Sequence, residues 1–232
     1  MSARNRWVTF DCFGTLVDWH GWLGAALRPL AGDRAPDLHR AYVVHERRVE
    51  REQPLQSYKD VLATALVRAA DSLGIPVSVS DARALPEGWS SMRLFSDVEA
   101  MLAELRLNGW QIGVLANCDD DLFEVTHRAF TRPFDLFVTS ERVRAFKPER
   151  WHFRAFELIT GVARHDWVHV GSSAYRDVGP ARAFGLTPLW VDCREREGSG
   201  RISSVRVASR ADVSRAIDDL LERDEVRLPA LQ

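Results

Sequence analysis

Apolar residues fall into two kinds of pattern along this chain. Five short, largely apolar runs are typical of strands buried on both faces of a parallel sheet. They cover residues 7–13, 110–117, 134–140, 166–173 and 187–193. Elsewhere, apolar residues at three- and four-residue spacing predict helices. The repeated alternation of strand and helix predicts an α/β fold with a doubly wound, Rossmann-like parallel sheet.

The stretch between the first two predicted strands breaks this alternation. From about residue 18 to residue 89 the spacing is helical throughout, and Gly74 and Pro76 end the last helix of this stretch. We therefore expect a small helical cap, residues 18–90, inserted into an α/β core formed by residues 1–17 and 91–232. A polar loop at 195–204 precedes a closing amphipathic helix.

Composition limits the classes of partner. The chain has 232 residues, 46% of them hydrophobic, and its 31 basic and 33 acidic residues give a net charge of -2, which favours neither a nucleic acid nor an acidic membrane. The segment HERRVERE, at 45–52, alternates in charge sign and indicates a solvated helix face. No apolar run approaches the roughly 20 residues that span a bilayer, and residues 1–7 lack the apolar core of a signal peptide, so a cytoplasmic location is expected. Three widely spaced cysteines indicate reduced thiols.

One acid interrupts the first apolar run. Asp11 lies between Phe10 and Phe13, and the run ends at Gly14. Ligands of doubly wound sheets bind beyond the carboxyl ends of the strands, so an acid there is a candidate nucleophile. Because burial alone would raise its pKa, Asp11 needs a counter-charge such as Lys147. The alternative is that Asp11 accepts backbone N–H groups at a turn.

Two other predicted strand ends carry polar groups, and Lys147 opens a helix after the third run. Asn117 ends the second run and is followed by three acids at 119–121, which indicate either a cationic ligand group or an acid-rich helix start. Ser172 and Ser173 end the fourth run. Asp177 lies near the start of a predicted helix at 175–185, where helix capping competes with catalysis as its role.

Together these segments resemble the haloacid dehalogenase superfamily. The resemblance is carried, over nearly the whole chain, by DCFGTLVD at 11–18, LAN at 115–117, Lys147-Pro148 and VGSSAYRD at 170–177. It implies an α/β core with a small cap that closes over the site. It also implies that Asp11 forms an ester intermediate, which water then hydrolyses.

Two departures concern the branch of the superfamily. Phosphatases carry a second Asp two places after the nucleophile, where this chain has Phe13, and a phenyl ring cannot protonate a leaving oxygen. They also bind Mg²⁺ with an acid that begins the fourth motif, where this chain has Ser172. In both respects the chain resembles the L-2-haloacid dehalogenase branch, which needs no metal, so no cofactor is expected.

Two alternatives remain open. One is a Mg²⁺-dependent phosphatase of small molecules. Its metal would lie at Asp11, Phe13 and Asp177, or at Asp177 with Asp119 or Asp120. The other is a non-catalytic protein that keeps the scaffold after losing part of the site.

The resemblance assigns roles position by position. Thr15 would support the nucleophile Asp11, Lys147 would neutralise it, and Ser172 with Asp177 would hold Lys147 and the hydrolytic water. Substrate contacts would come from Cys12, Phe13, Asn117 and Ser173. An apolar pocket from the cap would be lined by Trp19, Tyr42 and Tyr58, although aromatic residues at helical spacing are also typical of a core.

Departures from the dehalogenases bear on the substrate. Ala116 and Ala174 replace a serine and an asparagine of their motifs, and Phe153 replaces a tyrosine. The cap arginine that receives the halide falls at Val43, with Arg40 and Arg47 nearby. The substrate class expected is a small 2-substituted carboxylic acid, and these departures leave its leaving group, a halide or another substituent, unassigned. A homodimer is a further expectation.

Overall fold

The predicted α/β fold is present. The computed structural model describes residues 5–52, 54–191 and 205–227. The described part of the chain holds six strands in one all-parallel sheet, in the order β3-β2-β1-β4-β5-β6. They are β1 (Trp7–Phe10), β2 (Gln111–Ala116), β3 (Leu136–Thr139), β4 (Trp167–Gly171), β5 (Thr187–Val191) and β6 (Val205–Val207). Five of them correspond to predicted strands, and β6 was not predicted.

The register of the sheet places the candidate residues at one edge. β1 lies at the centre, and its last residue, Phe10, is opposite both Val114 of β2 and Val170 of β4. Parallel strands end at the same edge of a sheet, so the segments that follow β1, β2 and β4 meet there. Asp11, Asn117 and Ser172 belong to these three segments.

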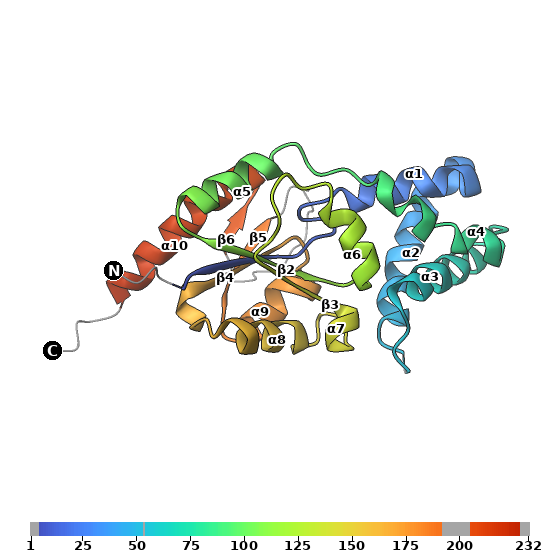
Figure 1. The fold of residues 1–232 in the computed structure, drawn as a ribbon. Helices are drawn as coiled ribbons and strands as arrows, with labels where there is room; N and C mark the ends of the chain where they lie inside the picture. Colours follow the sequence, from blue (N-terminus) through green and yellow to red (C-terminus); the bar gives the residue numbers. More distant parts are fainter. Residues whose placement is uncertain (1–4, 53, 192–204, 228–232) are drawn as a thin grey trace.

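Helices cover both faces of the sheet, which explains why its strands are apolar on both sides. Figure 1 shows α5 (Val98–Leu107) and α10 (Val213–Arg227) on one face, and α8 (Trp151–Thr160) and α9 (Gly179–Ala183) on the other. The remaining elements of this part are α6 (Asp120–His127), α7 (Ser140–Val143), η3 (Arg164–Asp166), η5 (Arg210–Asp212) and a π-helix, Ala174–Val178. The single helix predicted at 175–185 is thus a π-helix followed by α9.

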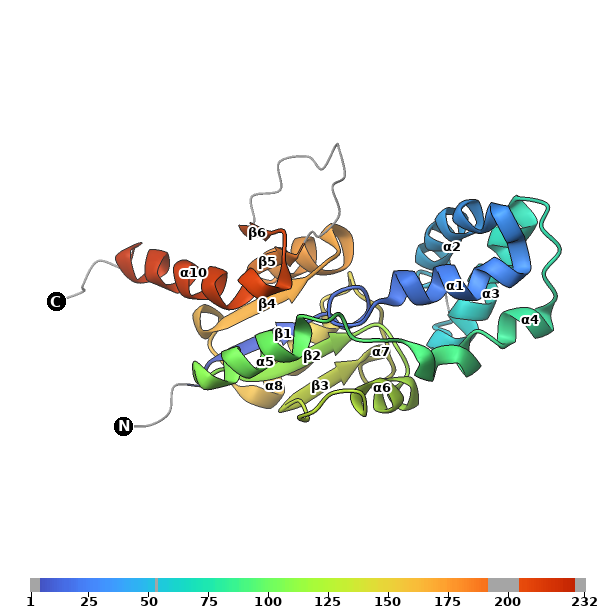
Figure 2. The ribbon, with the colours of Figure 1, turned by 90° about the horizontal axis from the view of Figure 1, so that it is seen from above.

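The stretch between β1 and β2 folds into helices that lie to one side of the sheet (Figures 1 and 2). We call residues 19–91 the helical region. It comprises α1 (Trp19–Ala31), η1 (Gly32–Arg34), α2 (Ala35–Val49), α3 (Tyr58–Ser72), α4 (Val79–Arg83) and η2 (Pro86–Ser91). Within the described ranges, none of the helices has the length and apolar character needed to cross a membrane.

The buried face of α2 contains one exception to its pattern. Leu38, Tyr42, Glu46 and Val49 recur at three- and four-residue spacing and are all buried. Three of them are apolar or aromatic, as expected for a helix that packs on its neighbours. Glu46 breaks this pattern, and its contacts are described below.

The predicted polar loop at 195–204 and Cys193 lie outside the described residues. Cys12 and Cys118 are buried free thiols, as the composition indicated. Burial raises the pKa of both thiols well above the ordinary value.

Candidate active site

A tight turn after β1 places Asp11 at the edge of the sheet. The Asp11 N–H donates to the Val170 carbonyl (2.9 Å), which fixes the backbone, and Gly14 turns the chain with a φ of 93°. A Cβ atom at Gly14 would lie only 3.2 Å from Ser172 Oγ, so the close approach of the two loops also favours glycine. The Asp11 carboxylate accepts hydrogen bonds from the side chains of Thr15 (2.7 Å) and Lys147 (2.9 Å). These contacts, rather than backbone capping of a turn, account for its position.

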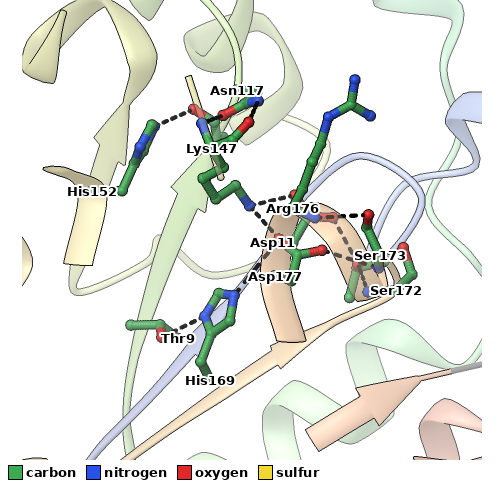
Figure 3. A network of polar contacts seen from close by, with 12 residues as sticks. Thr9, Asp11, Asn117, Lys147, His152, His169, Ser172, Ser173, Arg176 and Asp177 are labelled. Atoms are coloured by element: carbon green, nitrogen blue, oxygen red, sulfur yellow. Dashed lines mark hydrogen bonds and ion pairs between the residues drawn. The ribbon is translucent and has the colours of Figure 1, made fainter. Parts of the chain in front are cut away.

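The Lys147 ammonium lies between two carboxylates (Figure 3). Its Nζ donates to Asp11 Oδ1 at 2.9 Å and to Asp177 Oδ1 at 2.7 Å, and the lysine side chain is 0% exposed. Burial lowers the pKa of Lys147, but the two carboxylates outweigh burial and leave it above the ordinary value. Lys147 is therefore a permanent cation inside the protein.

The two carboxylates differ in acidity. Burial raises the pKa of Asp177, but the Lys147 charge outweighs burial and holds it well below the ordinary value. Burial and the negative charge of Asp177 raise the pKa of Asp11, and Lys147 and Thr15 offset this only in part. Asp11 is thus the more basic of the two acids, a property that suits a nucleophile.

Thr15 and Ser172 connect the first and fourth motifs. The Ser172 N–H donates to Thr15 Oγ1 (3.0 Å), and the two hydroxyl oxygens lie 3.1 Å apart. The Asp177 carboxylate also accepts the Ser173 N–H (3.1 Å). The five residues predicted as catalytic are therefore brought together at one edge of the sheet.

The Asn117 side chain forms hydrogen bonds with both backbone polar groups of Lys147. Its Oδ1 accepts the Lys147 N–H (2.8 Å) and the Ser140 hydroxyl (3.2 Å). Its Nδ2 donates to the Lys147 carbonyl and to Glu50, each at 3.1 Å. Both donor hydrogens and the acceptor of the Asn117 amide are thus engaged with protein groups.

The three acids at 119–121 belong to the start of α6 and its surroundings. Asp119 accepts the N–H groups of Tyr58 (2.7 Å) and Lys59 (3.0 Å), where α3 begins. Asp120 pairs with Arg142, and Asp121 pairs with Lys59. All three acids are therefore paired with protein groups, and no cationic group of a ligand is needed to explain them.

The residues present do not fit a divalent cation. Lys147 contacts both Asp11 and Asp177 and occupies the place between them, and Phe13, the third position considered, packs edge-on against Trp89 at 4.8 Å between ring centroids. Divalent cations require oxygen ligands, and an ammonium in that place repels them. Among the described residues, no group of three or more His, Cys, Asp or Glu side chains is arranged to hold a metal.

The aromatic residues predicted to line a pocket are largely buried. The Trp19 and Tyr42 rings lie 6.0 Å apart, and within the described ranges neither the Trp19 indole N–H nor the Tyr42 hydroxyl finds a partner. The Tyr58 hydroxyl donates to Glu46 (2.7 Å). Of the backbone groups after Asp11, the N–H groups of Cys12 and Phe13 make no backbone hydrogen bond among the described residues, and Cys12 is buried.

The interpretation of residues 45–52 as a solvated face was wrong for two of its acids. Glu46 and Glu50 are only 1% and 7% exposed. Arg176 of the π-helix donates through Nη2 to Glu46 (2.6 Å) and to Glu50 (2.9 Å). The alternation of charge sign did not indicate this burial, because the partner, Arg176, lies more than 120 residues away in the sequence. The available signal was the i, i+4 spacing of the two acids, which places them on the same helix face as Leu38 and Tyr42.

His169 is a second residue that the sequence did not indicate as part of the site. Its Nε2 lies 3.8 Å from Asp177 Oδ1. Its Nδ1 lies 2.9 Å from the Thr9 hydroxyl, which also accepts the Trp167 indole N–H (2.8 Å). Thr9 can then give its own proton to Nδ1, which places the imidazole proton on Nε2, toward Asp177. Burial lowers the pKa of His169, so the ring is neutral.

The structure also shows where the residues lie that differ from the dehalogenase motifs. Ala116 ends β2 and Ala174 begins the π-helix, and the Phe153 ring lies edge-on to His169 at 4.9 Å between centroids. On α2, Arg40 pairs with Asp37 at the surface, Arg47 lies over the Tyr175 ring, and the half-buried Val43 packs against the core.

Comparison with known proteins gives the family. A model of haloacid dehalogenase-like hydrolases matches residues 6–185. The chain belongs to this hydrolase family.

Individual relatives are more distant. The chain is 23% identical over 191 residues to the (S)-2-haloacid dehalogenase of Pseudomonas sp., covering 80% of this chain and 82% of the relative. It is 33% identical over 101 residues to a phosphoserine phosphatase of Thermus thermophilus, covering 43% and 41%. The structure of Xanthobacter autotrophicus L-2-haloacid dehalogenase with chloropropionic acid covalently bound superposes with a TM-score of 0.79 at 20% identity, covering 92% of this chain and 98% of that one.

Proposed function

We propose that this hydrolase displaces a substituent from C2 of a small 2-substituted carboxylic acid, with Asp11 as nucleophile and without a metal. The observation that carries the proposal is the buried Lys147 ammonium, 2.9 Å from Asp11 and 2.7 Å from Asp177. It favours the ionised form of Asp11, and a cation held against one oxygen of each carboxylate disfavours a second cation beside them. We also propose that residues 18–90 form the cap and that residues 1–17 and 91–232 form the core.

The reaction has two steps. An Asp11 oxygen attacks C2, the bond from C2 to the substituent breaks, and the substituent leaves with the electron pair, so an ester forms. Water then attacks the carbonyl carbon of this ester and the ester C–O bond breaks. One proton of the water ends on the departing alkoxide, which leaves as the 2-hydroxy acid, and the other passes to solvent, so the Asp11 carboxylate is restored. Ser172 and Asp177 hold Lys147 and the water for this step.

Binding follows from the groups beside Asp11. The unengaged N–H groups of Cys12 and Phe13 receive the substrate carboxylate, with Ser173 nearby in the fourth motif. On the side of the helical region, the apolar part of the substrate site is formed by Trp19, Tyr42 and Tyr58. The (S)-2-haloacid dehalogenase among the relatives supports this substrate class.

Chloride release from (S)-2-chloropropionate tests the proposal. The wild type should release chloride, and Asp11→Asn should not. Asp121→Asn removes an exposed carboxylate of α6 and should release chloride at the wild-type rate. A single turnover in ¹⁸O-labelled water should place the label in Asp11, because water attacks the ester carbonyl. Release without label in Asp11 would show that water attacks C2 directly.

The phosphatase alternative has one observation in its favour, the similarity to a phosphoserine phosphatase over 101 residues. It predicts hydrolysis of phosphoserine or p-nitrophenyl phosphate that requires Mg²⁺ and stops with EDTA. We expect no such hydrolysis, because Phe13 supplies no acid and Lys147 lies between the two carboxylates. EDTA-sensitive phosphate release would replace our proposal with this one.

A further inference from the structure

Two carboxylates of the helical region reach the core beside the candidate active site. Glu46 and Glu50 lie one helical turn apart, and both are buried. Like charges at this spacing repel each other, and a buried carboxylate is costly unless it is paired. Their contacts with the core therefore require an explanation beyond packing.

Arg176 is the cation that pairs with both acids. Its Nη2 donates to Glu46 at 2.6 Å and to Glu50 at 2.9 Å, and its Nε lies 3.3 Å from Glu50. It belongs to a π-helix, an element that is rare and frequent at functional sites. Burial lowers the pKa of Arg176, but the two acids outweigh burial, so it stays charged.

Two chains of contacts lead from these acids to Lys147. In the first, Glu50 Oε1 accepts from Asn117 Nδ2 (3.1 Å), and the same amide binds both the N–H and the carbonyl of Lys147. In the second, Glu50 Oε2 accepts from Arg176, whose neighbour in sequence, Asp177, accepts from Lys147 Nζ (2.7 Å). Glu50 thus contacts both chains, one through each oxygen.

We propose that Glu50 is a positioning residue that couples the docking of the helical region to the placement of Lys147, and so to the charge state of Asp11. The inference rests on the proposed role of Asp11 as nucleophile. When α2 is docked, the backbone and the ammonium of Lys147 are both held. When it is not, Asn117 loses one acceptor, Arg176 loses its partners, and the ammonium is less firmly held against Asp11.

The chain offers a matched pair of variants. Glu50→Gln replaces one of the two acceptor oxygens by an NH₂ group, which must then face either Asn117 Nδ2 or Arg176, both of which are donors. Glu46→Gln removes the same charge one turn away, but its oxygen can serve Arg176 while its NH₂ donates to the Tyr58 hydroxyl, which can also accept. Only the first variant breaks a chain that leads to Lys147.

Hydrogen exchange of the Lys147 ammonium, measured at pH 8, where Glu50 is ionised, and followed by ¹⁵N NMR with labelled lysine, reports its placement without any substrate. We expect exchange to be at least tenfold faster in Glu50→Gln than in the wild type, and within twofold of the wild type in Glu46→Gln. Equal exchange in the wild type and Glu50→Gln would overturn the proposal. If exchange is accelerated equally in both variants, the proposal is overturned too, because the effect would then come only from the loss of one negative charge beside Arg176.

A kinetic measurement separates this inference from the proposed function. In single turnovers with (S)-2-chloropropionate, the acid limb of ester formation should move to higher pH in Glu50→Gln and stay in place in Glu46→Gln. If the wild type forms no ester, the proposed function fails, while the exchange measurement still decides whether Glu50 positions Lys147. If Glu50→Gln does not fold, Glu50→Asp, which keeps two acceptor oxygens on a shorter side chain, should give exchange faster than the wild type, and unchanged exchange would overturn the proposal.

Discussion

Replacement of Lys147 by methionine tests how the charges of the candidate site are balanced. The lysine side chain is fully buried, and its Nζ lies 2.9 Å and 2.7 Å from the carboxylates of Asp11 and Asp177. Methionine fills much of the same volume with an apolar, flexible chain. The variant therefore leaves two buried carboxylates without their shared cation.

The size of the effect follows from these distances. At about 2.8 Å and an effective dielectric constant of about 20, each contact has a gross Coulomb energy of about 6 kcal/mol. Most of this is offset because the ammonium no longer has to be desolvated and because one carboxylate can take up a proton. Removing one partner of a buried ion pair costs about 3–5 kcal/mol net, which we expect for Lys147→Met at pH 8.

The loss should depend on pH with a definite sign. In the wild type the folded-state pKa of Asp177 is lowered, so its stabilisation is present above the unfolded value near 3.8 and is lost as pH falls through the folded value. In the variant, burial raises the folded-state pKa of both carboxylates, so stability falls as pH rises through those values. The difference between the two proteins should therefore be larger at pH 8 than at pH 5.

Urea unfolding followed by circular dichroism at the two pH values measures this difference. Lys59→Met is the control, because Lys59 pairs with Asp121 at the surface, where the side chains are 41% and 65% exposed, and should cost less than about 1 kcal/mol. A loss below about 1 kcal/mol for Lys147→Met at pH 8, or an equal loss at both pH values, would refute the reasoning.

Three further variants test other parts of the structure. His169→Leu leaves the buried Thr9 hydroxyl without its imidazole acceptor and should lower the free energy of unfolding by about 1–3 kcal/mol. An unchanged free energy in urea unfolding would argue against a hydrogen bond from Thr9 to a neutral imidazole. The pKa of Glu50 is raised to about 7 from 4.5, mainly by burial, so the folded protein binds this proton more tightly and loses about 3 kcal/mol of stability as pH rises from about 4.5 to 7. Glu50→Gln should flatten the dependence of Tm on pH in that window, and an unchanged slope would contradict it. Trp89→Phe removes an indole N–H that donates to the Leu122 carbonyl (3.0 Å) between η2 and α6 and should cost about 1 kcal/mol in urea unfolding, whereas an unchanged midpoint would mean that this link adds no stability.

The sheet and the centre of the site could be predicted because both depend on short-range signals. Strands buried on both faces form continuous apolar runs, and parallel strands bring their ends to one edge. A polar residue directly after such a run, such as Asp11 or Ser172, is therefore placed by the fold itself. Lys147 and Asp177 could be named from the sequence only as a possible counter-charge and as an acid at a helix start, because neither directly follows a run. Their roles were assigned by the resemblance to a known family.

The parts that could not be predicted depend on tertiary contacts. β6 is only three residues long, too short for a clear alternation of apolar and polar positions. Glu46 and Glu50 were assigned to solvent because they lie among arginines, and the sequence did not show that Arg176 would bury them. His169 lies inside an apolar run, where a buried structural histidine and a neighbour of Asp177 have the same pattern.

The buried charges between α2 and the π-helix are not explained by stability. Apolar side chains of α2, such as Leu38 and Val49, already supply the packing of this helix. A buried ion pair is often no more stable than well-packed apolar residues of similar volume, because desolvation offsets the attraction. Hydrogen bonds from Asn117 and Arg176 do, however, restrict the orientation of Glu50 far more than apolar contacts would. The cluster is therefore better explained by the orientation it imposes on α2 relative to Lys147 than by any gain in folding free energy.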